Sequence, residues 1–220
     1  MRRILIAIVI AGALTAPAVP AQESLSKVSG SVTAEAGKQY GEVSTVNGSV
    51  RVERGATVGG EASTVNGSIT VEDEARLGSA STVNGALRIG AGVVVEGEAT
   101  TVNGALTIGE GSRVAQDART VNGRIVIAGA EIGGDVRTTA GDIELQPGTV
   151  VHGDLVVEKP SFSLFSWGNR SEPPRVVVGP DAAVHGELRF EREVRLFVSE
   201  RATVGRISGA EPIRFAGDTP

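Results

Sequence analysis

The chain has 220 residues, among them 30 Gly and 9 Pro, but only one Trp, one Tyr, five Phe and no Cys. Its formal net charge of −5 gives no electrostatic basis for binding nucleic acid or an anionic membrane. The lack of Cys excludes a disulfide framework. Many small and β-branched residues with few rings favour short strands and tight corners over an ordinary layered core.

Residues 1–21 have the pattern of a secretory signal peptide. Arg2 and Arg3 precede an apolar run at 4–14, and cleavage is expected after Ala21. The run is shorter than the ~20 apolar residues that span a bilayer. We therefore expect an exported protein, located in the periplasm or at the cell surface of a Gram-negative bacterium. An uncleaved membrane anchor is the alternative.

One tetrapeptide, Thr-Val-Asn-Gly, returns along the chain at spacings of 19, 18, 19 and 19 residues. Such self-similarity is the signature of a solenoid, in which a coil buries its inner face only by stacking on the next coil. The copies begin at Thr45, Thr64, Thr82, Thr101 and Thr120.

Apolar residues within each period fall into three hexads. The first residue of a hexad and its small or aliphatic fifth residue are expected to point inward, because strand residues two apart face the same way. One coil has first residues Val46, Val52 and Val58. The 19-residue copies are expected to carry their extra residue at a corner. The valines of the tetrapeptide are thus predicted to form one interior column: Val46, Val65, Val83 and Val102.

The Asn-Gly step is expected to form a corner, because Asn tolerates positive φ and Gly adopts it freely. Stacked corners would bring the asparagine amides into a hydrogen-bonded ladder. The threonines of the tetrapeptide would form a parallel outward file. Such a file could also bind ice, an alternative that the corner role of Asn disfavours. The ladder is expected at Asn47, Asn66, Asn84, Asn103 and Asn122.

The repeat predicts an all-β chain: a single-stranded parallel β-helix with triangular coils of 18–19 residues. About nine coils are expected within residues 22–215, forming a rod roughly 40 Å long at ~4.8 Å per coil. A polar tail follows at 216–220. An insertion at 160–174 interrupts the repeat at a position where Asn-Gly turns elsewhere. It holds three aromatic residues: Phe162, Phe165 and Trp167.

The sequence offers little catalytic or metal-binding chemistry. His152 and His185 are interpreted as exposed corner residues, because no partners for a catalytic triad are visible. With no Cys and no histidines paired in the sequence, neither a metal site nor a cofactor is expected. The acidic cluster at 72–74 is interpreted as a solvated corner rather than as the acid pair of a polysaccharide-cleaving enzyme. We therefore predict no catalytic residues.

The hexads, the Gly-rich corners and two Val-His-Gly-Asp/Glu-Leu segments, at 151–155 and 184–188, resemble the bactofilins, which are polymer-forming cytoskeletal β-helix proteins of bacteria. The resemblance covers roughly residues 27–207. It implies a right-handed helix that self-associates through its ends. The Thr-Val-Asn-Gly array also resembles uncharacterised exported β-solenoid proteins of Gram-negative bacteria.

Three functions are therefore considered. The first is structural: a self-assembling scaffold of the cell envelope, joined through its open coil ends. The second is an adhesin-like or envelope-binding module that presents loop 160–174 to a protein, glycan or lipid. The rings of that loop could instead fold back and shield the rod. A carbohydrate-active or acyltransferase-type enzyme is the remote third.

Overall fold

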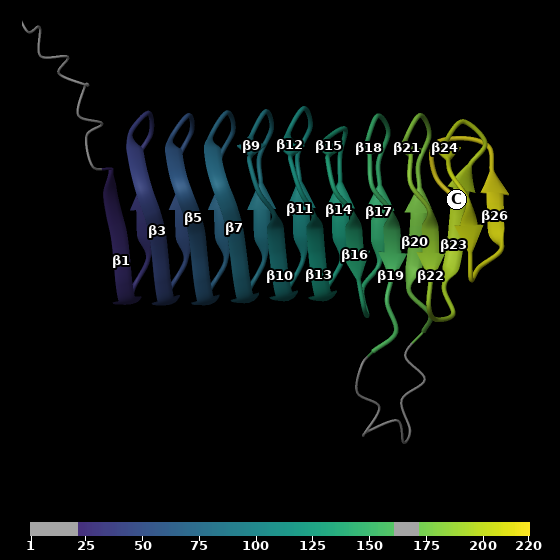
Figure 1. Ribbon diagram of the computed structural model, residues 1–220, viewed down its shortest axis with the longest axis horizontal. Coiled ribbons are helices and arrows are strands. Elements are labelled where there is room, and N and C mark those ends of the chain that lie inside the picture. The colour runs from purple at the N-terminus through teal and green to yellow at the C-terminus, as the bar shows by residue number, and fades with distance from the viewer. Residues whose placement is uncertain (1–21, 161–171) are drawn as a thin grey trace, which may run out of the picture.

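The computed structural model describes residues 22–160 and 172–220, and in these ranges the chain forms a β-solenoid of about ten turns (Figure 1). Every strand pairing is parallel, as in the β3–β5 and β4–β6 pairs. The predicted all-β coiled fold is confirmed, with ten strands stacked on one face rather than nine. Among the described residues, no helix has the length and hydropathy needed to cross a membrane.

One face of the rod is a ten-stranded sheet to which each coil contributes one strand. Most of its strands alternate between buried and more exposed residues: in β4, Val50 and Val52 are buried and Arg51 between them is exposed. The strands are β2 (Val32–Ala34), β4 (Val50–Val52), β6 (Ile69–Val71), β8 (Leu87–Ile89), β11 (Leu106–Ile108), β14 (Ile125–Ile127), β17 (Ile143–Leu145), β20 (Arg175–Val178), β23 (Arg195–Ser199) and β26 (Pro212–Phe215).

The other two faces share a sixteen-stranded sheet, which β1 (Glu23–Ser29) opens by pairing with β3. Early coils cross both faces with one long strand: β3 (Gln39–Asn47), β5 (Thr57–Asn66) or β7 (Arg76–Asn84). Later coils divide into two strands. The second face then holds β9 (Val94–Val95), β12 (Arg113–Val114), β15 (Glu131–Ile132), β18 (Val150–Val151), β21 (Ala183–Val184) and β24 (Thr203–Val204). The third holds β10 (Ala99–Asn103), β13 (Ala118–Asn122), β16 (Val136–Thr138), β19 (Leu155–Val157), β22 (Leu188–Phe190) and β25 (Ile207–Ser208).

The extra residue of a 19-residue coil lies at a corner, as predicted. The pairing of β5 with β7 shifts register between Val58 and Glu61. At this point β5 contains two glycines, Gly59 and Gly60, where β7 has only Gly78. Changes in coil length are therefore absorbed between faces and leave the inward positions of the flanking strands aligned.

The tetrapeptide is oriented opposite to the prediction. Val46, Val65 and Val83 stack in adjacent coils, but they lie on the outside, with exposed fractions of 41%, 41% and 39%. Val102 is partly exposed. The interior valine column is therefore wrong. The hexad pattern predicts the wrong inward residues at this corner. The two residues that point inward are an alanine and a threonine, such as Ala62 and Thr64, and not the valine.

The predicted outward file of threonines is also wrong, because all five threonines are buried. Each hydroxyl donates to the glycine carbonyl of the preceding coil, as from Thr64 Oγ1 to the Gly48 oxygen at 2.8 Å. Leaving a buried carbonyl without a donor would cost about 1–3 kcal/mol. The other four threonine hydroxyls make the same hydrogen bond at 2.9–3.2 Å: Thr45, Thr82, Thr101 and Thr120. Because the threonines face inward, they offer no flat surface for ice binding.

The glycine of the tetrapeptide serves close packing rather than positive φ, which corrects the corner prediction. Neither the Asn nor the Gly of the five copies has a positive φ. A Cβ atom on Gly85 would instead lie 2.0 Å from the Gly67 carbonyl oxygen. Most residues with positive φ occupy a different corner of the coil: Gly37, Gly55, Glu74, Gly92, Gly111, Gly129, Gly148 and Asp181.

The two kinds of glycine should respond differently to alanine. Gly85→Ala should lower the free energy of unfolding by about 3 kcal/mol or more, because the added methyl overlaps a backbone oxygen that moves only if two coils separate. Gly92→Ala should cost only about 1 kcal/mol, because its φ of +63° is strained but the nearest atom to the new methyl is 3.9 Å away. Urea unfolding of both variants measures the difference, and equal losses would contradict the close-packing role.

Candidate functional site: the asparagine edge

The asparagine edge is the line of Asn-Gly corners that runs along the N-terminal part of the rod. Its side chains form the predicted ladder, in which each amide Nδ2 donates to the Oδ1 of the asparagine one coil earlier. Both atoms of the amide are used at inner positions: Asn84 donates to Asn66 and accepts from Asn103, each at 3.0 Å. The ladder contains Asn47, Asn66, Asn84, Asn103 and Asn122, with separations of 2.9–3.0 Å.

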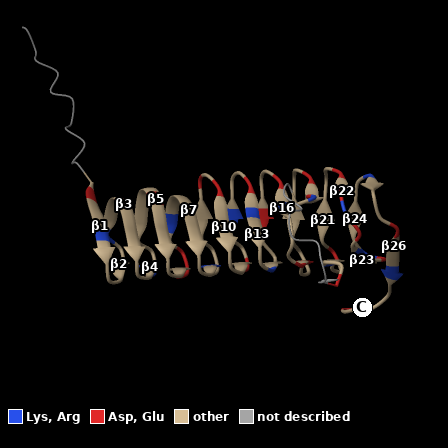
Figure 2. Ribbon diagram, turned by 90° about the horizontal axis from the view of Figure 1, so that it is seen from below, with Lys and Arg blue, Asp and Glu red and all other residues tan. Residues whose placement is uncertain are grey.

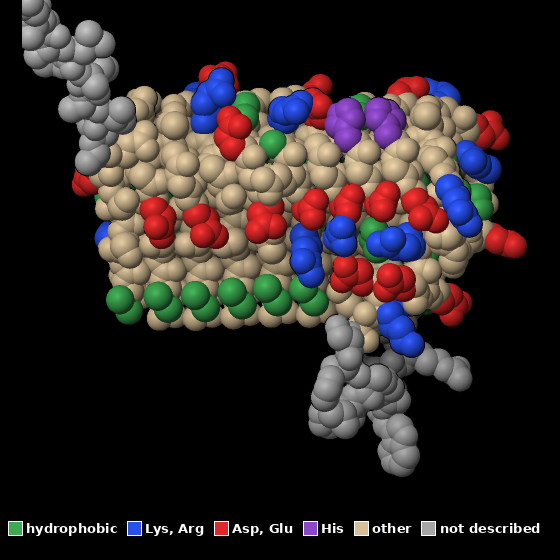
Figure 3. Space-filling model, viewed as in Figure 1, with side chains coloured by type: hydrophobic (Ala, Val, Ile, Leu, Met, Phe, Trp, Pro, Cys, Tyr) green, Lys and Arg blue, Asp and Glu red, His purple; other side chains and the backbone are tan. Residues whose placement is uncertain are grey.

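A file of valines, one residue before each asparagine, borders the ladder on the outside. Figure 3 shows a row of hydrophobic side chains along this edge of the rod. Val28, in the first coil, has the same position and is 73% exposed. The edge thus presents aliphatic groups and amides side by side, with no charged residue in the repeated Val-Asn-Gly steps. The members of the file are Val28, Val46, Val65, Val83, Val102 and Val121.

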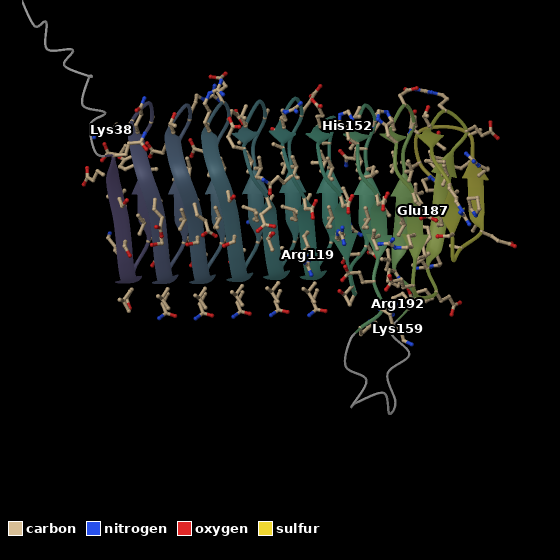
Figure 4. All side chains as sticks on the ribbon, in the orientation of Figure 1. Lys38, Arg119, His152, Lys159, Glu187 and Arg192 are labelled. Atoms are coloured by element: carbon tan, nitrogen blue, oxygen red, sulfur yellow. The ribbon has the colours of Figure 1, made fainter. Side chains whose placement is uncertain are left out.

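The ladder ends at Asn122, because the next coil has Ala140 at the equivalent position. Charged residues follow on the same edge, where Figure 4 places Lys159 and Arg192. Arg192 Nη1 donates to the Thr139 carbonyl at 3.1 Å. The asparagine edge therefore changes from amide and aliphatic to charged where the insertion begins.

The insertion at 160–174 follows β19 in the sequence, where the Asn-Gly corner stands in earlier coils. After the insertion, β20 resumes the stack in register: Val176 pairs with Ile143. The three aromatic residues proposed as a binding surface, Phe162, Phe165 and Trp167, lie outside the described residues.

A second ladder, which the sequence analysis missed, is made of acidic residues on the C-terminal part of the rod. Asp117 Oδ1 accepts from the Asp135 amide at 2.9 Å, and Asp135 Oδ1 accepts from the Asp154 amide at 2.7 Å. Asp154 in turn accepts from the Glu187 amide at 2.8 Å. These carboxylates thus accept hydrogen bonds from backbone N–H groups of the next coil, which satisfies those donors.

Arg137 offsets the charge of this acidic ladder. It forms an ion pair with Asp135 and lies 3.8 Å from both Asp117 and Glu158. The sequence signal is a glycine just before Asp135, Asp154 and Glu187. A Cβ on Gly153 would lie 2.2 Å from Asp135 Oδ1. Lys and Arg elsewhere are interspersed with Asp and Glu along the rod (Figure 2).

The two histidines are exposed at a corner, as predicted, but the structure also brings them together. Their ring centroids are 5.1 Å apart and their planes meet at 72°. They lie on adjacent coils because β18 pairs with β21, although the insertion separates them by 33 residues in the sequence. Figure 3 shows them side by side. The two Val-His-Gly segments are separated in the sequence by the length of one coil plus the length of the insertion. This spacing could have predicted the pairing.

His152 also contacts an ion pair. Its Nε2 lies 2.8 Å from Glu131 Oε1, and Arg113 Nη1 lies 2.7 Å from the same oxygen. The hydrogen bond with His152, followed by that with Arg113, lowers the pKa of Glu131 below its ordinary value. Among the described residues, no group of three or more His, Cys, Asp or Glu side chains is arranged to hold a metal ion.

Comparison of the chain with protein-family models, curated proteins and solved structures found no match. Functional inference therefore depends on the geometry of the rod itself.

Each asparagine of the ladder should stabilise the rod in proportion to the number of ladder hydrogen bonds that its amide makes. Asn84→Ala removes two ladder bonds and should lower the free energy of unfolding by about 1 kcal/mol. Asn122→Ala removes one, from the end of the ladder, and should cost about half as much. Urea unfolding compares the two variants. Equal losses, or none, would show that the ladder contributes nothing beyond local turn geometry.

Proposed function

We propose that this protein is an exported structural rod of the Gram-negative cell envelope, whose copies associate through the ends of the coil stack. The observation that carries the proposal is the open-ended arrangement of the strands. Within the described residues, β1 and β2 at one end pair only with β3 and β4, and β24, β25 and β26 each have one partner at the other end. Unpaired strand edges are templates for another chain.

Two further features support the proposal. The core is a single, mostly aliphatic column that is buried from Val32 to Val198, so the coils stack into one continuous rod. The resemblance to the bactofilins favours end-to-end association, and the apolar segment at 4–14 favours export.

Charged residues at both ends set the strength of this association. Lys27 pairs with Thr45 and so occupies the column of buried threonines. At the other end, Arg214 pairs with Val198 and Pro212 pairs with Leu196, two buried positions. Charges at inward positions and an edge proline both weaken strand addition. End-to-end contacts that bury Lys27 and Arg214 are therefore expected to be weak and reversible.

Sedimentation velocity of the full chain over a wide concentration range tests the proposal. The wild type should show association that increases with concentration. The double variant Lys27→Thr, Arg214→Val gives each end strand the residue type of its partner in the neighbouring coil. It should form longer assemblies than the wild type at the same concentration. A control, Arg51→Thr with Arg88→Val, removes two outward charges from β4 and β8, which are not end strands, and should behave as the wild type. Monomers at every concentration, in the wild type and the double variant alike, would refute association through the ends.

A further inference from the structure

The histidine pair is the strongest feature that a structural rod does not require. The chain has only these two histidines and no cysteine, yet both imidazoles lie on one corner of adjacent coils. Gly133, one coil before His152, and Gly205, one coil after His185, occupy the equivalent positions. The pair is therefore bounded along the rod by residues without side chains, and both rings are exposed.

A hydrogen bond to a carboxylate selects the tautomer of one neutral ring. An ionised carboxylate can only accept, so neutral His152 donates to Glu131 through Nε2 and leaves the Nδ1 lone pair free. Arg113 holds the same carboxylate oxygen from the preceding coil. Carboxylate groups that accept from the far nitrogen of an imidazole orient metal-binding histidines and raise their basicity. The arrangement Arg113–Glu131–His152 has this form.

We infer that His152 and His185 together bind one divalent transition-metal ion, of the class of Cu²⁺, Ni²⁺ and Zn²⁺. Imidazole nitrogen is a preferred ligand for these ions. Metal–nitrogen bonds of about 2.0–2.1 Å require the two ligating nitrogens to lie roughly 3.3 Å apart. The two exposed rings, with centroids 5.1 Å apart, are close enough for side-chain rotation to be the only movement that the proposal requires. Glu131 is a positioning residue, since it acts through His152.

The surroundings leave the other coordination positions open. The surface beside His152 is hollowed into a depression of about 410 Å³, lined also by Arg113, Glu131 and Gly129. The depression forms because the corner at Gly129 is one residue shorter than the corner at Gly111. Water or an added anionic ligand would complete the coordination of the ion. A site with two protein ligands is consistent with the lack of three-residue clusters among the described side chains.

Calorimetric titration of the full chain, without a histidine tag, with CuCl₂, NiCl₂ or ZnCl₂ alone tests the inference. We expect one equivalent of ion to bind, with Cu²⁺ tightest. His152→Ala and His185→Ala should each abolish this binding. Glu131→Gln should weaken it by about tenfold or more. Glu98→Gln, a matched control, removes an equal charge from a position that contacts neither histidine, and should bind as the wild type does.

Electron paramagnetic resonance of the Cu²⁺ complex supplies a readout independent of affinity, since hyperfine structure from two nitrogen nuclei is expected. Unfolding curves of each variant check that the rod remains folded. The inference is overturned if the wild type binds none of the ions, or if either histidine variant retains the binding. These results do not bear on end-to-end association, because the pair lies away from both ends of the rod (Figure 3).

Discussion

The structure depends on one close contact, made where each coil of the N-terminal part passes over the glycine corner of the coil before it. The carbonyl oxygen of one glycine occupies the space in which the next glycine's side chain would begin, and a Cβ on Gly67, Gly85, Gly104 or Gly123 would lie only 1.9–2.0 Å from it. Any larger residue would separate the coils at that point. The contact therefore fixes the identity of the residue and the path of the backbone together.

The other three residues of the tetrapeptide follow from this contact. Threonine faces inward because its hydroxyl can donate to the glycine carbonyl in the narrow interior. Valine, next in the strand, must then face outward, since alternate residues of a strand face opposite sides. Asparagine follows at the corner, where its amide reaches the asparagine of the neighbouring coil. A change at any of the four positions should thus disturb the contact between two neighbouring coils.

The sequence period predicted the class of fold, the stacking and the asparagine ladder, because each depends only on equal spacing. The period could not predict which side of the strand faces the core at Thr-Val. Valine is the more apolar residue, and the rule that apolar residues lie inside selects it. The rule fails because the inward position needs a hydrogen-bond donor for the glycine carbonyl, which threonine supplies and valine does not. The histidine pair was missed for another reason: the insertion conceals that residues 152 and 185 are one coil apart.

The inward threonine is the central claim, and thiol labelling tests it most directly because the native chain has no cysteine. Single variants Thr82→Cys and Val83→Cys place a thiol on either side of the same strand, at native exposures of 2% and 39%. In the folded protein the thiol at 83 should react rapidly with a maleimide, whereas the thiol at 82 should react only after the chain is unfolded. Rapid labelling at 82 with protection at 83 would contradict the account.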